Sequence, residues 1–190
     1  MTGVSGDPRV APEIGVVSWL SERDDSRGVW RAWRGRDHSR NGRGGLVVVD
    51  YKSQPWMNAH GQVAGRPAFV RKNVGLLSID SAAFPHLALV SLLYRDVAAD
   101  GRPADGDEWA RLDSTEERIA DAMQDRLGAC FALCVTSGGS RDLFFFLSTA
   151  ITDEEADGLI QAIRPSVDYE IGIVYDPEWR PYRELMPDPA

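Results

Sequence analysis

The residue types that most often carry chemistry are sparse in this sequence and follow no catalytic spacing. Its three histidines, His38, His60 and His86, lie far apart and form neither an HxH nor an HExxH motif, so the metal-ligand spacings of zinc sites are missing. Cys130 and Cys134 fall within an apolar run, where a buried thiol is usually inert. No GxSxG, GxGxxG or GxxxxGK[ST] motif occurs. We therefore expect no catalytic residue, no metal and no bound cofactor.

The two cysteines also indicate the compartment. On one strand their spacing would place them roughly 13 Å apart, too far for a disulfide. Free, buried thiols are typical of a reducing environment. The N-terminus lacks the basic start and apolar stretch of a secretory signal, and no apolar run approaches the ~20 residues of a membrane-spanning helix. These features predict a soluble, cytoplasmic protein.

Charge is distributed unevenly along the chain. Residues 1–72 hold twelve basic and seven acidic side chains, a balance of +5, whereas residues 73–190 hold nine basic and twenty-two acidic, a balance of −13. The resulting net charge of −8 makes nucleic acid an improbable partner, because binding to phosphates depends on Lys and Arg. Trp30, Arg31 and Trp33 interleave aromatic and basic groups, but alternation between core and surface explains them more simply.

Polar and aromatic residues near the C-terminus are the candidates for a binding site. In the tail after the last strand, Trp179, Tyr182 and Leu185 fit a short helical stripe that seals the edge of the core; the alternative is a recognition surface shared with a basic loop at Arg141. That loop, Ser137–Asp142, is most simply a hairpin turn, although its glycines could also form an anion nest. The candidate binding residues are Arg71, Arg141, Asp176, Trp179 and Tyr182.

Acidic side chains on a helix predicted over residues 109–127 are a second possible source of chemistry. Glu116, Glu117, Asp121 and Asp125 are abundant enough to offer a carboxylate pair, but we expect them on the solvated face of that helix.

The elements that would position these residues are clearest between His86 and Tyr175. Strands are predicted over 86–94, 130–136, 143–147 and 169–175, and helices over 109–127 and 152–163, with capping boxes at Ser114–Glu117 and Thr152–Glu155. This order is that of a ferredoxin-like β-α-β-β-α-β unit in an α+β protein. The runs 131–135 and 143–147 are apolar on successive residues, so both faces of these strands should be covered.

The N-terminal half is expected to supply that cover or to extend the sheet. Short strands are predicted at Val29–Trp33, Leu46–Tyr51, Pro67–Arg71 and Val74–Ile79, with a polar connector over Arg34–Gly45. The domain organisation expected is a flexible tail over 1–13, a β-rich region over 14–80 and the ferredoxin-like domain over 81–190.

The chain resembles a family of bacterial proteins known as domain of unknown function 695. The resemblance spans roughly Gly65 to Pro187 and is carried by Arg66–Asn73, by Cys130–Leu147, and most specifically by the sequence Asp-Pro-Glu-Trp at 176–179 followed by Tyr182. That family is distantly similar to the ribonuclease E inhibitor B family, small acidic proteins that bind a large enzyme. The resemblance implies an α+β fold and a protein partner, but no established activity.

Three functional hypotheses follow. The first is a non-enzymatic protein-binding or regulatory module that uses its acidic C-terminal domain or an uncovered sheet face. The second is a small-molecule binder or enzyme with a pocket between the N-terminal strands and the C-terminal sheet, in which Arg71, Arg141 or Asp176 supply polar contacts. The third is an immunity-type inhibitor. A homodimer through the sheet face is expected only if the N-terminal strands leave that face bare.

Overall fold

The computed structural model describes residues 50–63 and 65–185. Its strands, α-helices and 3-10 helices (η) follow in the order η3 (Tyr51–Ser53), β1 (Trp56–Val63), β2 (Arg66–Asn73), η4 (Val74–Leu76), η5 (Ser81–Ala83), β3 (His86–Leu93), α1 (Gly106–Leu127), β4 (Cys130–Ser137), β5 (Ser140–Leu147), α2 (Asp153–Ala162), β6 (Asp168–Tyr175) and α3 (Arg180–Glu184). This is an α+β fold, as the sequence predicts.

The two long helices begin and end at residues suited to those positions. The Asp105 side chain accepts a hydrogen bond from the Glu108 amide and caps α1, so the helix begins well before the predicted capping box at Ser114–Glu117, which lies inside it and is wrong. Gly128 ends α1 in the left-handed conformation that only glycine adopts without strain. The capping box predicted at Thr152 and Glu155 is confirmed at the start of α2.

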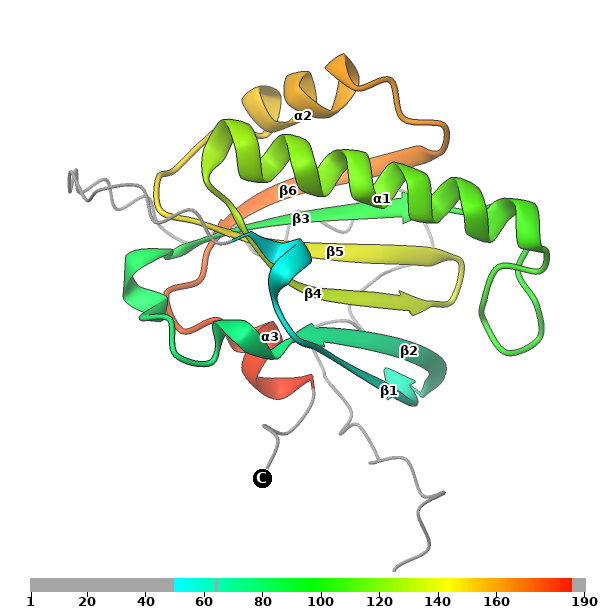
Figure 1. Cartoon of the computed structure of the whole chain (residues 1–190). Coiled ribbons are helices and arrows are strands. Elements are labelled where there is room, and N and C mark those ends of the chain that lie inside the picture. Colours follow the sequence, from blue (N-terminus) through cyan, green and yellow to red (C-terminus); the bar gives the residue numbers. More distant parts are fainter. Residues whose placement is uncertain (1–49, 64, 186–190) are drawn as a thin grey trace, which may run out of the picture.

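A six-stranded antiparallel sheet in the order β1-β2-β4-β5-β3-β6 forms the centre of the molecule (Figure 1). In this order β5 lies between the two strands that α1 connects, β3 and β4, and β3 lies between the two that α2 connects, β5 and β6. This interlocked arrangement of two split β-α-β units is the predicted β-α-β-β-α-β unit. β1 and β2 form a hairpin that extends the same sheet beyond β4.

Both faces of the central strands are buried, as their apolar runs predict. Alternate residues of β5 point to opposite faces: Leu143 and Phe145 join the core under α1 and α2, whereas Phe144 and Phe146 join the core on the other face, where α3 lies (Figure 1). A homodimer was expected only if the sheet face were bare. Every residue of β5 is buried in the single chain, and the homodimer itself stays a prediction.

The two cysteines are free and buried, as predicted. A bulge between Phe131 and Leu133 shifts the register of β4, so Cys130 and Cys134 belong to cores on opposite faces of the sheet.

Among the predicted N-terminal strands, Pro67–Arg71 is confirmed within β2. Val74–Ile79 is wrong, because the Asn73 side chain accepts a hydrogen bond from the Gly75 amide and starts the 3-10 helix η4 instead. The strand β1 was not predicted.

The remaining N-terminal predictions fall largely outside the described residues. These are the tail over 1–13, the strand Val29–Trp33, the connector Arg34–Gly45 and most of Leu46–Tyr51, of which Tyr51 itself begins η3. None of the helices in the described part of the chain is both long and apolar enough to span a bilayer.

Candidate functional site

A cluster of two arginines and one glutamate joins α1 to the sheet. Arg71 comes from β2 and Arg141 from β5, and both side chains point to the face that α1 covers. Strand register places them together, since Arg71 lies opposite Cys134 in β4 and Arg141 lies opposite Thr136 in the same strand. Glu116 reaches down to them from α1.

The Glu116 carboxylate bridges the two guanidinium groups. Its Oε1 accepts a hydrogen bond from Arg71 Nη2, and its Oε2 accepts one from Arg141 Nη1 at 3.0 Å. Arg141 Nη1 also donates to Asp113 Oδ1 at 2.5 Å. The Arg141 side chain is 2% exposed and that of Glu116 is 10% exposed, so these charges are almost completely removed from water. The Arg141 guanidinium also lies 5.0 Å from the centre of the Trp109 ring.

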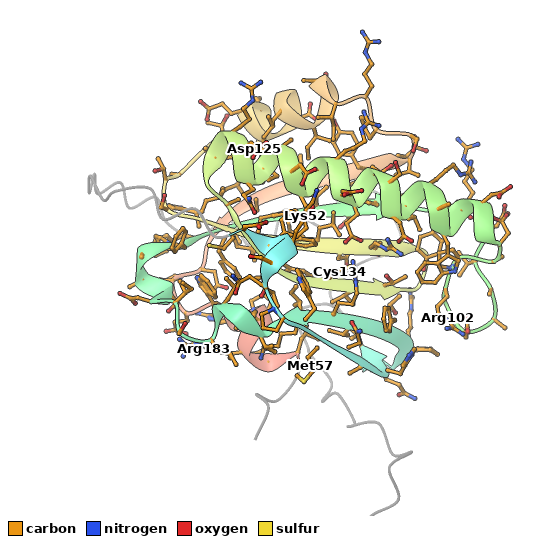
Figure 2. The ribbon with its side chains drawn as sticks, viewed as in Figure 1. Lys52, Met57, Arg102, Asp125, Cys134 and Arg183 are labelled. Carbon is orange, nitrogen blue, oxygen red and sulfur yellow. The ribbon has the colours of Figure 1, made fainter. Side chains whose placement is uncertain are left out.

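A thiol completes this cluster without adding reactivity. Cys134 Sγ lies 3.8 Å from Glu116 Oε2, and Figure 2 shows the residue beneath α1. Burial, with the negative charge of Glu116 as a further cause, raises the pKa of Cys134 to about 11. The thiol is therefore protonated at neutral pH, which does not suit a nucleophile.

In this arrangement each charged group of the cluster already has a partner of opposite charge. The carboxylate is shared by two guanidiniums, and Arg141 has a second carboxylate partner in Asp113. A ligand carboxylate or phosphate would have to displace Glu116 from a nearly buried position.

The C-terminal motif forms a second cluster, on the opposite face of the sheet. The Trp179 ring stacks on Phe146 with 4.2 Å between ring centres, and its Nε1 donates a hydrogen bond to the Phe84 carbonyl at 2.9 Å. The Tyr182 hydroxyl donates to the Asn73 carbonyl at 2.7 Å. With Leu185, these residues seal the core as predicted.

Asp176 is the turn residue of this motif. Its amide donates to the Pro85 carbonyl, and its Oδ2 accepts from the Arg180 amide at 2.9 Å, which fixes the chain between β6 and α3. Its Oδ1 is the single buried side-chain oxygen or nitrogen without a hydrogen-bond partner among the described residues. Burial raises the pKa of the Asp176 carboxyl above its ordinary value.

The predicted binding residues therefore separate into two groups. Arg71 and Arg141 meet through Glu116 under α1, whereas Asp176, Trp179 and Tyr182 lie across the sheet from them. Arg141 belongs to strand β5 and not to the turn, which consists of Gly138 and Gly139. The structure does not bring the two groups onto one surface or into one pocket.

Glu116 is the residue of this cluster that the sequence analysis missed. The prediction of a solvated acidic face holds for Glu117 and Asp125, which are exposed, and is wrong for Glu116. The signal was present in the spacing, because Glu116 lies four residues after Leu112 and three before Ile119, both fully buried.

Three carboxylates near the start of α1 lie close enough together to suggest a cation site, but two of them already accept hydrogen bonds from backbone amides. The ligand oxygens of Asp96, Asp105 and Glu108 lie within 4.8 Å of one another. The Glu108 carboxylate accepts from the amides of Arg95 and Asp96, and that of Asp105 accepts from the Glu108 amide.

A groove of about 470 Å³ runs between α2 and the edge strand β6. Its lining combines four apolar or aromatic side chains with two carboxylates: Asp157, Pro165, Val167, Asp168, Tyr169 and Ile171. The Tyr169 hydroxyl donates to Asp157 Oδ1 at 2.6 Å, and burial together with this hydrogen bond raises the pKa of Tyr169 to about 12. The phenol therefore stays neutral at neutral pH.

The surroundings of this groove are acidic. Residues 152–175 contain six acidic side chains and one basic side chain, Arg164. An ion pair with Arg95 at 4.0 Å partly offsets Asp168, but both side chains are largely exposed and such a contact is weak. Nothing in the sequence analysis pointed to this groove.

Comparison with known families assigns most of the chain. A family model described as a family of unknown function, DUF695, matches residues 54–186, which includes every strand of the sheet. The chain belongs to the DUF695 family. The resemblance predicted from the motif at 176–179 is thus confirmed, while the more distant similarity to the ribonuclease E inhibitor B family stays a prediction. Neither the curated proteins nor the solved structures contain a match to the chain.

Proposed function

We propose that this DUF695 protein is a non-enzymatic protein-binding module that engages its partner at the groove between α2 and β6. The observation that carries the proposal is the combination of a groove lined by apolar and acidic side chains with an edge strand and an acidic border. Grooves of this kind are recurrent sites of peptide recognition.

The other clusters support this proposal by elimination. The arginines and the glutamate under α1 are paired with one another, and the thiol beside them is protonated at neutral pH. The C-terminal aromatics pack into the core. In the described residues, the candidate arginines, the thiol and the C-terminal aromatics are therefore engaged in contacts within the fold.

Photo-cross-linking in cells that naturally express the protein tests the proposal. A photoreactive phenylalanine analogue replaces Val167, which lines the groove, in the full-length chain; a matched variant carries it at Leu77, which is 43% exposed and lies after η4. We expect a specific covalent adduct with another protein from position 167 and none from position 77. Equal adducts from both positions, or none from position 167, would contradict a docking site in this groove.

A further inference from the structure

From this proposed docking site, and resting on it, we infer that the partner binds as an extended segment that pairs with the outer edge of β6 and presents basic side chains to the groove. The inference concerns the mode of binding and the chemistry of the occupant.

The outer edge of β6 has its backbone groups directed away from the sheet. In the described chain, β6 pairs with β3 alone and is the last strand of the sheet. The Ile173 amide donates to the Asp153 carboxylate at 2.9 Å, so it points away from β3. In an antiparallel strand the N–H and C=O of one residue point to the same side, and the direction repeats every second residue. The backbone groups of Tyr169 and Ile171 therefore also point outward.

These outward-pointing backbone groups belong to residues that also line the groove. Tyr169 and Ile171 line it with their side chains, and both project to the face where α2 lies. An extended segment added beside β6 would thus make main-chain hydrogen bonds to these two residues while its alternate side chains enter the groove between α2 and the strand. Asp153 limits the free edge at the other end, because its carboxylate already accepts from Ile173.

The acidic side chains in and around the groove favour a positively charged occupant. Asp157 and Asp168 line the groove, and the surrounding segment 152–175 has a net charge of −5 from six acidic residues and one basic residue. A segment that alternates apolar and basic side chains complements this surface. A second copy of this chain fits less well, because pairing β6 with β6 would bring two such acidic groups together.

Fluorescence anisotropy with the full-length protein tests the inference. The probe is a labelled ten-residue peptide of alternating Val and Lys, and its controls are the Val and Glu analogue and a peptide with five Val followed by five Lys. Two further peptides carry backbone N-methyl groups, one on every Val and the other on every Lys. In an added strand only every second amide faces β6, so we expect one methylated peptide to bind like the parent and the other to lose binding at least tenfold.

Charge variants provide the second readout. Asp168→Asn should weaken binding of the Val and Lys peptide by about threefold, the scale expected for one exposed charge. Asp125→Asn, which removes the same charge from the last turn of α1 (Figure 2), should leave the affinity unchanged. Equal effects of the two variants would mean that the peptide responds only to net charge, and would overturn the inference.

The outcomes separate this inference from the proposed function. If position 167 cross-links a protein in cells while both methylated peptides bind equally, the docking site stands and strand pairing is wrong. Equal binding of the Val and Glu peptide, or of the peptide with blocked rather than alternating Lys, overturns the occupant's chemistry. A protein that is dimeric by mass photometry, with β6 protected by its own copy in hydrogen exchange, would replace the basic segment with a second chain.

Discussion

Substitution of Glu116 by Gln tests how much the buried charge cluster contributes to the free energy of unfolding. Removing one partner of a fully buried ion pair costs about 3–5 kcal/mol, because the remaining charge is buried without compensation. Here Arg141 keeps Asp113 as a partner, and the Arg71 side chain is 30% exposed and can be rehydrated. We therefore expect Glu116→Gln to lower the free energy of unfolding by about 2–3 kcal/mol.

Urea unfolding, followed by far-UV circular dichroism and tryptophan fluorescence, measures this loss. The matched control is Glu117→Gln, the same change at the next position, where the side chain is 63% exposed and pairs with Lys52. We expect it to cost no more than about 1 kcal/mol. If the two variants lose equal stability, Glu116 does not hold α1 to the sheet and our interpretation of the cluster is wrong.

Replacing all three charged residues of the cluster with apolar residues provides a second test of the same reasoning. Arg71→Met, Glu116→Leu and Arg141→Met together remove all three charges and leave apolar side chains of similar size. Since buried ion pairs often contribute little relative to well-packed apolar groups, this triple variant should be more stable than Glu116→Gln alone. A triple variant less stable than Glu116→Gln would show that the pair itself, and not the uncompensated charge, dominates.

Three further outcomes are expected. Tyr182→Phe, which removes only the hydroxyl bound to the Asn73 carbonyl, should lower the free energy of unfolding by about 1–2 kcal/mol, whereas Tyr175→Phe at a 48%-exposed position should change it by less than about 0.5 kcal/mol. Gly128→Ala should destabilise by about 1 kcal/mol because φ is 61° there. Gly158→Ala, inside α2 where an added Cβ would meet open space, should stabilise by about 0.5–1 kcal/mol. Urea titrations that reverse this order would contradict both assignments. The two thiols should resist iodoacetamide at pH 7 in the native state and react in urea. The reason is that burial raises the pKa of both thiols, that of Cys134 to about 11. Rapid labelling of the native protein would refute their burial.

Much of the fold was predictable because it depends on local patterns. The Thr152 capping box, the hairpin between 130 and 147 and the helical stripe at Trp179 all follow from residues near in sequence. The helix before 128 was predicted to begin too late because a Ser and Glu at the right spacing resembled a cap, while the actual cap is Asp105.

The candidate sites were harder to predict because they depend on register. Arg71 and Arg141 meet only because β2, β4 and β5 are neighbours, and no local pattern fixes that order. The strand β1 was missed since it contains Asn58, His60 and Gln62 at exposed alternate positions, and the apolar half of its pattern is weak.

The two strongest polar signals in the sequence have structural roles, and this bears on where function lies. The motif at 176–179 fixes α3 against the sheet, and Arg71 with Arg141 holds α1. Both signals consist of side chains that can be recognised directly in a sequence. Recognition at the edge of β6 would depend instead on backbone groups and on the shape of a groove, which many different side chains can provide. A family whose members share the sealing motif while differing along 152–175 would then share a scaffold and differ in partners.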